Sequence, residues 1–227
     1  MNAASISSSR FVVALLLAAV MAATRWHHFG SVFSLPDASL AVFFLAGIYL
    51  RSPLFLAGFL AEAALIDYLA ITVGGVSDFC ISSAYVFLIP AYAAPWLAGR
   101  WYAARHRLAW STLLPLGGAL LLSVGVAYLI SDGSFYLLSG RFPEVSAAEY
   151  FAQAVRHFPA YALHTALYVL LAAGVHVVVA AASGARLAHS ARQAGDRNRR
   201  GGAAGRFGRG DARAGTPPGK RRAPVAG

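Results

Sequence analysis

The sequence predicts an all-α integral membrane protein with six transmembrane helices and both termini in the cytoplasm. Of its 227 residues, 58% are hydrophobic and only 12% are charged, which is about half the charged fraction of an ordinary soluble domain. Several apolar stretches run for about 20 residues, the length that crosses the hydrocarbon core of a bilayer. The basic residues are concentrated near the C-terminal end, and such an asymmetry sets the orientation of a membrane protein.

Six apolar segments are expected to be the spans: 10–26, 35–51, 53–72, 80–103, 109–131 and 159–183. The second is short and opens with Leu35-Pro36-Asp37, and both proline and aspartate suit the first turn of a helix. The fourth contains Pro90 and Pro95, which predict a kink. Residues 1–23 also resemble a signal peptide, although the A-x-A-like cleavage site is poor. Cleavage there would leave five spans.

The orientation follows from the basic residues. With both termini inside, sixteen Lys and Arg residues lie on the cytoplasmic side, and only Arg25, Arg141 and Arg156 lie outside. Residues 184–227 hold eleven of the basic residues against two Asp, a net charge of +9. This tail is rich in Gly, Ala and Pro, so we expect it to be disordered and to lie near anionic headgroups. The sequence thus divides into a six-helix transmembrane domain, residues 1–183, and a basic tail, residues 184–227.

Two short motifs in the tail do not make nucleotide or nucleic-acid sites. Residues 215–220, Gly-Thr-Pro-Pro-Gly-Lys, have the wrong spacing for a phosphate-binding loop and lack a Ser or Thr after the Lys. Residues 206–210, Arg-Phe-Gly-Arg-Gly, are one copy of a glycine-arginine repeat, which is too little for RNA binding. We therefore expect no ATP site in this chain and no nucleic-acid partner.

A cluster of polar residues is expected at the outer face. Four separate parts of the chain contribute to it: His27, His28, Asp67, Asp78, Cys80, Tyr85, Arg156 and His157. Asp67 is the most costly, because an ionised carboxylate well inside a bilayer costs about 2.5–3.5 kcal/mol. It should face a cavity or a partner, unless it snorkels to the interface. Glu62, His164 and His176 are expected to make packing or polar contacts between helices rather than to bind a ligand.

Cys80 is the only cysteine, so it cannot form an internal disulfide. It is therefore a buried inert sulfur, a reactive thiol or a soft metal ligand. Tyr85 follows five residues later, and residues five apart on one regular helix do not point the same way. For both to line one pocket, Cys80 must lie at or before the start of the fourth helix. One Cys with scattered His residues is no tetrahedral zinc set.

Two function classes other than ligand binding also fit these residues. One is a membrane enzyme with Cys80 as nucleophile and His28 as base, although nothing supplies an obvious oxyanion hole. The other is a non-catalytic scaffold of a membrane complex, in which the basic tail recruits a partner.

The residues resemble the BtuM family, which are small bacterial inner-membrane transporters of cobalamin (vitamin B12). That family is related to the substrate-binding S-components of energy-coupling-factor transporters. The resemblance covers residues 10–183. It rests on Arg25-Trp26-His27-His28-Phe29-Gly30-Ser31, Leu35-Pro36-Asp37-Ala38-Ser39, Asp67, Asp78-Phe79-Cys80 and Tyr85.

The resemblance implies an S-component-like fold that binds cobalamin in a cavity open to the periplasm. Residues 1–183 would then be the substrate-binding domain of a multi-pass protein of the bacterial inner membrane. The resemblance implies that Cys80 ligates the cobalt axially and that its thiolate removes cyanide from cyanocobalamin. His28, Asp67, Tyr85 and Arg156 match positions that line the pocket in this family.

The first segment also suggests a protein partner. It carries small residues at four-residue spacing, Ala14-Ala18-Ala22 and Ala19-Ala23, and such a strip lets another helix approach closely. The resemblance implies contact with a coupling module made of a transmembrane subunit and ATPases, although some members of the family work without one. Cobalamin and lipid are the other expected partners.

Overall fold

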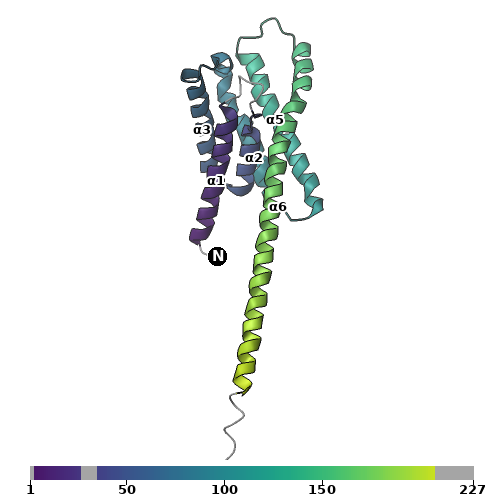
Figure 1. Ribbon diagram of the computed structural model, residues 1–227. Coiled ribbons are helices and arrows are strands. Elements are labelled where there is room, and N and C mark those ends of the chain that lie inside the picture. Colours follow the sequence, from purple (N-terminus) through teal and green to yellow (C-terminus); the bar gives the residue numbers. More distant parts are fainter. Residues whose placement is uncertain (1–2, 27–34, 208–227) are drawn as a thin grey trace, which may run out of the picture. The chain divides into compact units, whose positions relative to one another are not determined.

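The computed structural model describes residues 3–26 and 35–207, and within them the side chains of residues 8–26, 35–79 and 81–185. This described part consists of helices and the segments that connect them, without a strand. Its elements are α1 (Ala3–Arg25), α2 (Ser39–Tyr49), α3 (Pro53–Thr72), the 3₁₀ turns η1 (Asp78–Cys80) and η2 (Ser83–Phe87), α4 (Leu88–Ala103), the 3₁₀ turn η3 (Trp110–Thr112), α5 (Leu113–Leu138) and α6 (Ala147–Phe207) (Figure 1). Each of the six predicted segments contains one α-helix, which confirms the all-helical fold class.

Four of these helical stretches are long and apolar enough to cross a membrane: Ser8–Arg25, Pro53–Thr72, Trp110–Leu138 and Ala147–Ala185. The other two predicted spans contain shorter helices. The helix α2 has 11 residues, a length of about 17 Å, whereas a bilayer core is about 30 Å thick. The helix α4 has 16 residues, because the first part of the predicted fourth span folds as η1 and η2 instead of regular helix.

Two further boundaries differ from the prediction. The helix α5 continues to Leu138, and α6 begins at Ala147, twelve residues before the apolar run that begins at Pro159. The early start of α6 follows from a capping box. Glu149 Oε2 accepts hydrogen bonds from the Ser146 backbone N–H and hydroxyl, both at 2.8 Å, and the Glu149 N–H donates back to Ser146 Oγ at 3.3 Å.

The chain divides into two compact units, residues 1–174 and 175–227. The first unit holds α1 to α5 and the first part of α6, and the second holds the rest of that helix, which continues to Phe207. The sequence predicts a disordered tail from residue 184, but residues 184–207 are helical here. Ala, Arg and Gln dominate residues 185–194, and these are strong helix formers. Residues 208–227 of the predicted tail lie outside the described residues.

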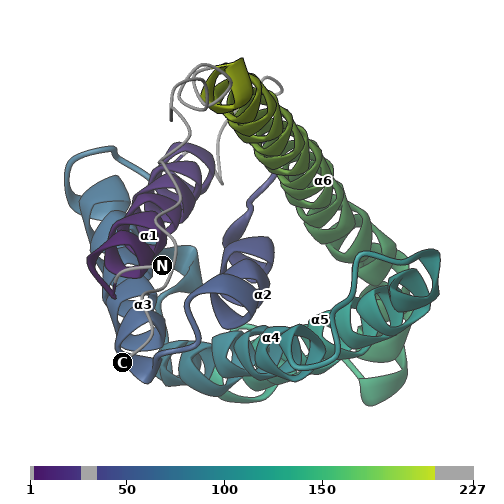
Figure 2. The same ribbon diagram turned by 90° about the horizontal axis from the view of Figure 1, so that it is seen from below.

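Within the first unit, α2 is the central helix. Eight of its eleven residues are buried, and Figure 2 shows it surrounded by α1, α3, α4 and α5. Val42 and Phe43 pack in a core with residues of α1, α3 and α4, whereas Ala41 and Phe44 pack in a second core with α4, α5 and α6. A helix that is apolar all round in this way needs protein on every side.

The α2–α4 contact is unusually close. A Cβ atom on Gly47 would collide with the backbone carbonyl of Trp96, and one on Gly99 would collide with that of Phe44. The two backbones therefore touch directly, which only glycine permits. The Phe43 and Tyr92 rings stack beside this contact, with centroids 4.4 Å apart.

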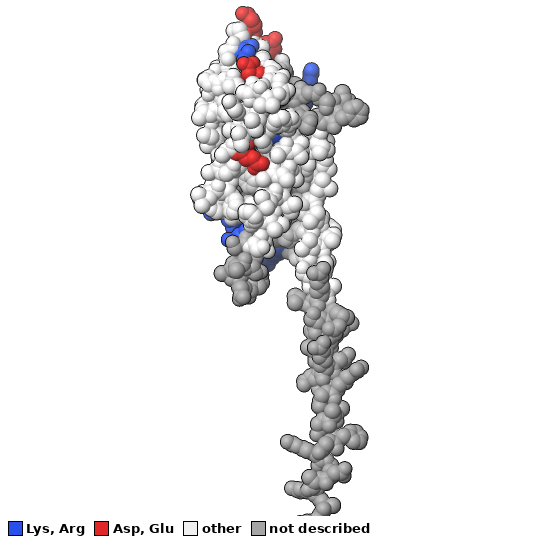
Figure 3. Space-filling view, turned by 60° about the vertical axis from the view of Figure 1, so that its left-hand side comes forward, with Lys and Arg blue, Asp and Glu red and all other residues white. Residues whose placement is uncertain are grey.

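The outside of the helices is apolar. Large side chains are exposed along the long helices, among them Leu54 at 80%, Leu114 at 84% and Leu122 at 72%. Figure 3 shows a mostly uncharged face, with charged side chains gathered towards its upper and lower ends and one acidic patch between them. An apolar surface of this extent is compatible with a protein embedded in a membrane.

Candidate functional site

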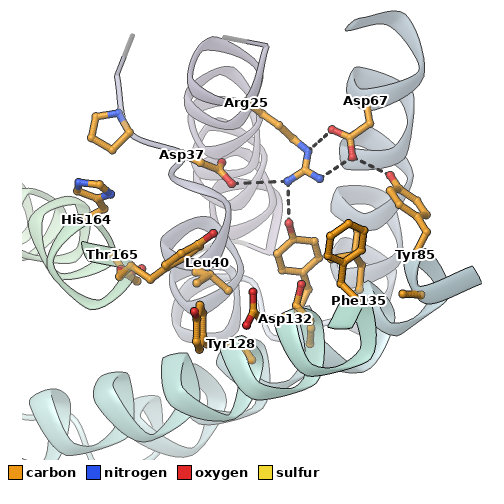
Figure 4. A pocket seen from close by; sticks show the side chains of 18 of the residues that line it. Arg25, Asp37, Leu40, Asp67, Tyr85, Tyr128, Asp132, Phe135, His164 and Thr165 are labelled. Carbon is orange, nitrogen blue, oxygen red and sulfur yellow. Dashed lines mark hydrogen bonds and ion pairs between the residues drawn. The ribbon is translucent and has the colours of Figure 1, made fainter. Parts of the chain in front are cut away.

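A cavity of about 740 Å³ opens in the first unit. It is lined by the C-terminal parts of α1, α3 and α5, by the segment before α2, by residues 76–88 and the start of α4, and by residues 160–165 of α6. Consecutive helices thus contribute alternate ends, so the cavity lies at one end of the bundle. Figure 4 shows a ring of polar and aromatic side chains that point into it from separate helices.

Arg25, the last residue of α1, is the centre of one wall. Its Nε and Nη2 donate to the two carboxylate oxygens of Asp67 at 2.7 and 2.6 Å. Its Nη1 donates to Ser39 Oγ at 3.0 Å and to the Tyr92 hydroxyl at 2.7 Å, and lies 3.7 Å from Asp37 Oδ2. The arginine is only 8% exposed. A bidentate pair of this kind is stronger and more directional than a lysine contact would be.

The start of α2 is built to meet this arginine. Asp37 Oδ1 accepts from the Ser39 N–H at 3.0 Å and from its hydroxyl at 2.7 Å, which satisfies backbone groups at the helix start. Thr24 Oγ1 accepts from the Ala38 N–H at 3.2 Å, and the Tyr168 hydroxyl donates to the Pro36 carbonyl at 2.7 Å. Residues 36–39 are thereby tied to both α1 and α6.

Tyr85 in η2 completes this wall. Its hydroxyl donates to Asp67 Oδ2 at 2.7 Å, so Asp67 receives hydrogen bonds from both Arg25 and Tyr85 (Figure 4). The carboxylate that the sequence identifies as most costly in lipid is therefore satisfied inside the protein. A buried ion pair with its remaining oxygen lone pairs used is the arrangement in which such a pair is tolerated.

Cys80 is the last residue of η1, and its backbone lies before α4. This position agrees with the spacing argument, which requires Cys80 to precede the regular helix. Gly75, with φ of 66°, makes the turn that leads into this segment. Ser77 and Ile81, on either side of Cys80, both line the cavity.

The segment that carries Cys80 is held against the end of α5. Ser83 Oγ donates to the Leu138 carbonyl at 2.7 Å. The Phe79 ring meets Phe135 edge-on at 5.6 Å, and the Arg141 guanidinium lies 4.7 Å from the Phe79 ring centroid. These contacts place residues 77–85 along the cavity.

The opposite wall comes from α5 and α6. Asp132 and Phe135 of α5 point into the cavity, and so does Tyr128 one turn before Asp132 (Figure 4). Tyr161, whose ring centroid lies 5.0 Å from that of Tyr128, comes from α6. His164, expected from the sequence to be a packing residue, also lines the cavity.

The structure brings together some of the predicted site residues and not others. Asp67 and Tyr85 meet in the cavity, with Cys80 on a segment that lines it. Arg156 does not line the cavity; its side chain is exposed on α6, one turn before the first α6 residue that does. His28 lies outside the described residues.

Arg25 and Asp132 are the main site residues that the sequence reasoning did not identify. In the sequence, Arg25 marks the orientation and belongs to the stretch that carries the resemblance, but it is not a predicted site residue, although a charge at the end of an apolar span suggests an ion pair. Asp132 lies beyond residue 131, the predicted end of the fifth span, and so escapes the search for charges within spans.

The structure also divides the small-residue strip of α1. Ala14 and Ala18 pack against the core of the first unit, whereas Ala19, Ala22 and Ala23 are exposed. A partner helix could approach the second group only.

In the part of the chain that the structure describes, no three His, Cys, Asp or Glu side chains are arranged to hold a metal ion. Compared with models of known protein families and with curated protein sequences, the chain matches none.

Proposed function

We propose that this protein binds cobalamin in the large cavity and takes it up across a bacterial inner membrane, with Cys80 as the axial ligand of cobalt. The observation that carries the proposal is that the only cysteine of the chain lies on a short 3₁₀ turn whose neighbours, Ser77 and Ile81, line the cavity. A thiolate is a soft ligand suited to a transition metal, and a cavity of this kind is the usual place for an organic ligand.

The lining suits a large, flat ligand edged with amides. Tyr85, Tyr128 and Phe135 supply aromatic surface for the corrin ring, and Asp132 and Thr165 supply hydrogen-bonding groups. The volume of about 740 Å³ falls within the range of about 300–1,000 Å³ typical of small-molecule pockets. Cobalamin with its nucleotide arm is larger than such ligands, so we place the corrin in the cavity and the nucleotide arm at its mouth.

The proposed chemistry is an exchange of axial ligands. The Cys80 thiolate donates a lone pair to cobalt(III), and cyanide leaves with its bonding pair and takes up the proton that the thiol lost. No oxidation state changes, so no reductant is needed. This exchange would account for removal of cyanide from cyanocobalamin, and the same thiolate would hold other forms of cobalamin.

The proposal includes six membrane crossings with cytoplasmic termini and a cavity that faces the periplasm. The alternation of helix ends around the cavity supports it, because six helices that run up and down must place Arg25, Asp67 and Cys80 at one face. The excess of basic residues on the opposite side supports the orientation. If a coupling module binds α1, the exposed Ala19, Ala22 and Ala23 are the residues it would meet.

The test is to purify the full chain in detergent with cyanocobalamin and to record the visible spectrum. We expect a shift of the corrin bands in the wild type, because a sulfur ligand replaces cyanide. Cys80→Ser keeps the size of the side chain but offers a hard oxygen, so the shift should be lost. An unshifted spectrum in the wild type, or the same shift in Cys80→Ser, would overturn the ligation.

Uptake needs a separate test. A cobalamin-dependent bacterial strain that lacks its own uptake systems should grow on low cobalamin when it carries the wild-type chain. Failure to support growth while the purified protein still binds cobalamin would reduce the proposal to binding alone.

A further inference from the structure

The two walls of the cavity differ in charge. Arg25 lies against Asp37 and Asp67, and both ion pairs found among the described residues belong to it. Asp132, on the other wall, has no Lys or Arg within ion-pair distance in that part of the chain. Among the described residues, three carboxylates, one guanidinium and the His164 imidazole line the cavity, so the carboxylates outnumber the arginine by two.

Asp132 is not a surface carboxylate that water simply covers. It is half-buried on α5, inside one of the helical stretches long enough to cross a membrane. It also borders a second, smaller cavity of about 60 Å³, which is lined by Tyr150, Gln153 and His157 as well. An acidic group at such a depth usually faces a partner or a functional cavity.

The groups around Asp132 do not include a fixed cation. The Tyr128 and Tyr150 hydroxyls interact with its carboxylate, but they are neutral. His157 also acts on Asp132 electrostatically, but its side chain is exposed and donates from Nδ1 to the Gln153 carbonyl at 2.9 Å. A volume of about 60 Å³ holds one or two waters, since each occupies about 30 Å³ in the liquid. The polar side of Asp132 that faces the large cavity is left for a ligand.

The surroundings of Asp132 in the large cavity identify the kind of group that would bind. The Tyr128 hydroxyl interacts with the Asp132 carboxylate, and the rings of Tyr128, Tyr161 and Phe135 line the same wall of the cavity. A carboxylate beside aromatic rings favours binding of a group with N–H donors that can also pack against a ring, such as an amide or an ammonium. It disfavours binding of an anion. An ionised carboxylate only accepts hydrogen bonds, so it can bind an N–H of a primary amide but not a second carboxylate.

We infer that Asp132 is the acceptor of a second subsite, which holds a primary amide of the ligand at the α5–α6 wall. The inference rests on the proposed function, because the edge of a corrin carries such amides as side chains. In this subsite Asp132 accepts a hydrogen bond from the N–H of one amide, while Cys80 binds the cobalt. A carboxylate in place of that amide would repel Asp132 and lose the N–H hydrogen bond.

The experiment compares cyanocobalamin with the monocarboxylic acids obtained by hydrolysing one of its propionamides. Affinities are measured for the wild type, Asp132→Asn and a control, Glu62→Gln. Glu62 is also half-buried in an apolar helix but lines neither cavity, so the control removes one such charge without touching the site. Asp132→Ser replaces Asp132→Asn if the latter does not give monodisperse protein.

We expect the wild type to bind at least one monocarboxylic acid about tenfold more weakly than cyanocobalamin, a difference of about 1.4 kcal/mol. Asp132→Asn should bring the two affinities within about twofold, and Glu62→Gln should keep the tenfold gap. An unchanged gap in Asp132→Asn, or equal binding of all the acids by the wild type, would overturn the subsite and leave the proposed function standing. If the wild type binds no corrinoid, the proposed function fails and takes the subsite with it.

Discussion

The cavity has one wall that is electrostatically complete and one that is not. At the α1–α3 wall, Asp67 receives both ends of the Arg25 guanidinium and the hydroxyl of Tyr85. At the α5–α6 wall, Asp132 has no Lys or Arg partner among the described residues; the Tyr128 and Tyr150 hydroxyls and the exposed His157 are the groups that act on it. The first wall is therefore expected to stabilise the fold without ligand, and the second to gain a strong partner only when ligand binds. Replacing Asp by Asn should then lower the stability of the ligand-free protein at the first wall and raise it at the second.

The largest effect is expected from Arg25→Met. It removes the one positive charge of the complete wall and leaves Asp37 and Asp67 facing each other without a counter-ion. Breaking a buried pair by removing one partner costs about 3–5 kcal/mol, so thermal unfolding in detergent should show a strong loss of stability or no folded protein. Adding Asp67→Asn to this variant should recover part of the loss. If Arg25→Met melts like the wild type, the pair is not a structural centre.

Asp67→Asn and Asp132→Asn test the contrast between the walls most directly. Asp67→Asn weakens three charge-assisted hydrogen bonds and leaves Arg25 unpaired, so we expect a loss of about 2–4 kcal/mol. Asp132→Asn removes a half-buried charge that has no Lys or Arg partner and only the Tyr128 and Tyr150 hydroxyls and His157 around it, so ligand-free protein should gain up to about 1 kcal/mol. Both are measured as shifts in the midpoint of thermal unfolding. A loss of stability in both variants would mean that the surrounding groups already offset the burial of the Asp132 charge in the free protein.

Tyr85→Phe should have a smaller effect in the same direction as Asp67→Asn. It deletes one hydrogen bond to a carboxylate at 2.7 Å, which contributes about 1.5–3 kcal/mol when buried and less at a half-exposed site. We expect a loss of about 1 kcal/mol and weaker binding of cyanocobalamin, because Asp67 would turn towards the cavity. The corresponding control is Tyr68→Phe, an exposed tyrosine one residue after Asp67, which should change neither quantity.

The smallest effect is expected from Arg156→Ala. The resemblance places this residue in the pocket, whereas its side chain is exposed and does not line the cavity. Affinity for cyanocobalamin should therefore change less than about twofold, or about 0.4 kcal/mol. A tenfold loss would show that the ligand reaches beyond the cavity to the start of α6.

Much of the fold could be predicted because it depends on length and hydrophobicity. Each apolar segment contains a helix, and the spacing between Cys80 and Tyr85 placed the cysteine before α4. The residues at which the helices begin and end are harder to predict from the sequence. The Ser146 capping box starts α6 before its apolar run, and the sequence around Cys80 gives no sign of two 3₁₀ turns. Helix length also depends on packing, as in α2, whose eleven residues are mostly buried by protein.

The site was harder to predict, because its residues are joined by contacts between distant segments. Asp67 is predictable from the cost of placing a carboxylate in an apolar segment. Arg25 lies at the end of its apolar segment, so its role becomes visible only once Asp67 is known to lie beside it. Asp132 lies just after the predicted end of the fifth span. A charge at a span end costs little free energy of insertion, so the sequence gives no reason to single it out. Arg156 was placed by resemblance alone, which gave no information on the direction of its side chain.

The glycine contact between α2 and α4 limits how this protein could move. Because Gly47 and Gly99 bring the two backbones together without side chains between them, neither helix can slide or roll past the other without steric collision. The pair should move as a single rigid body that carries Ser39 and Tyr92 with it. Under the proposed uptake, a step that releases ligand to the far side must be a displacement of α1 and α3, or of α5 and α6, relative to this fixed pair. Uptake should then survive cross-links that join α2 to α4 and be stopped by cross-links from α2 to α5.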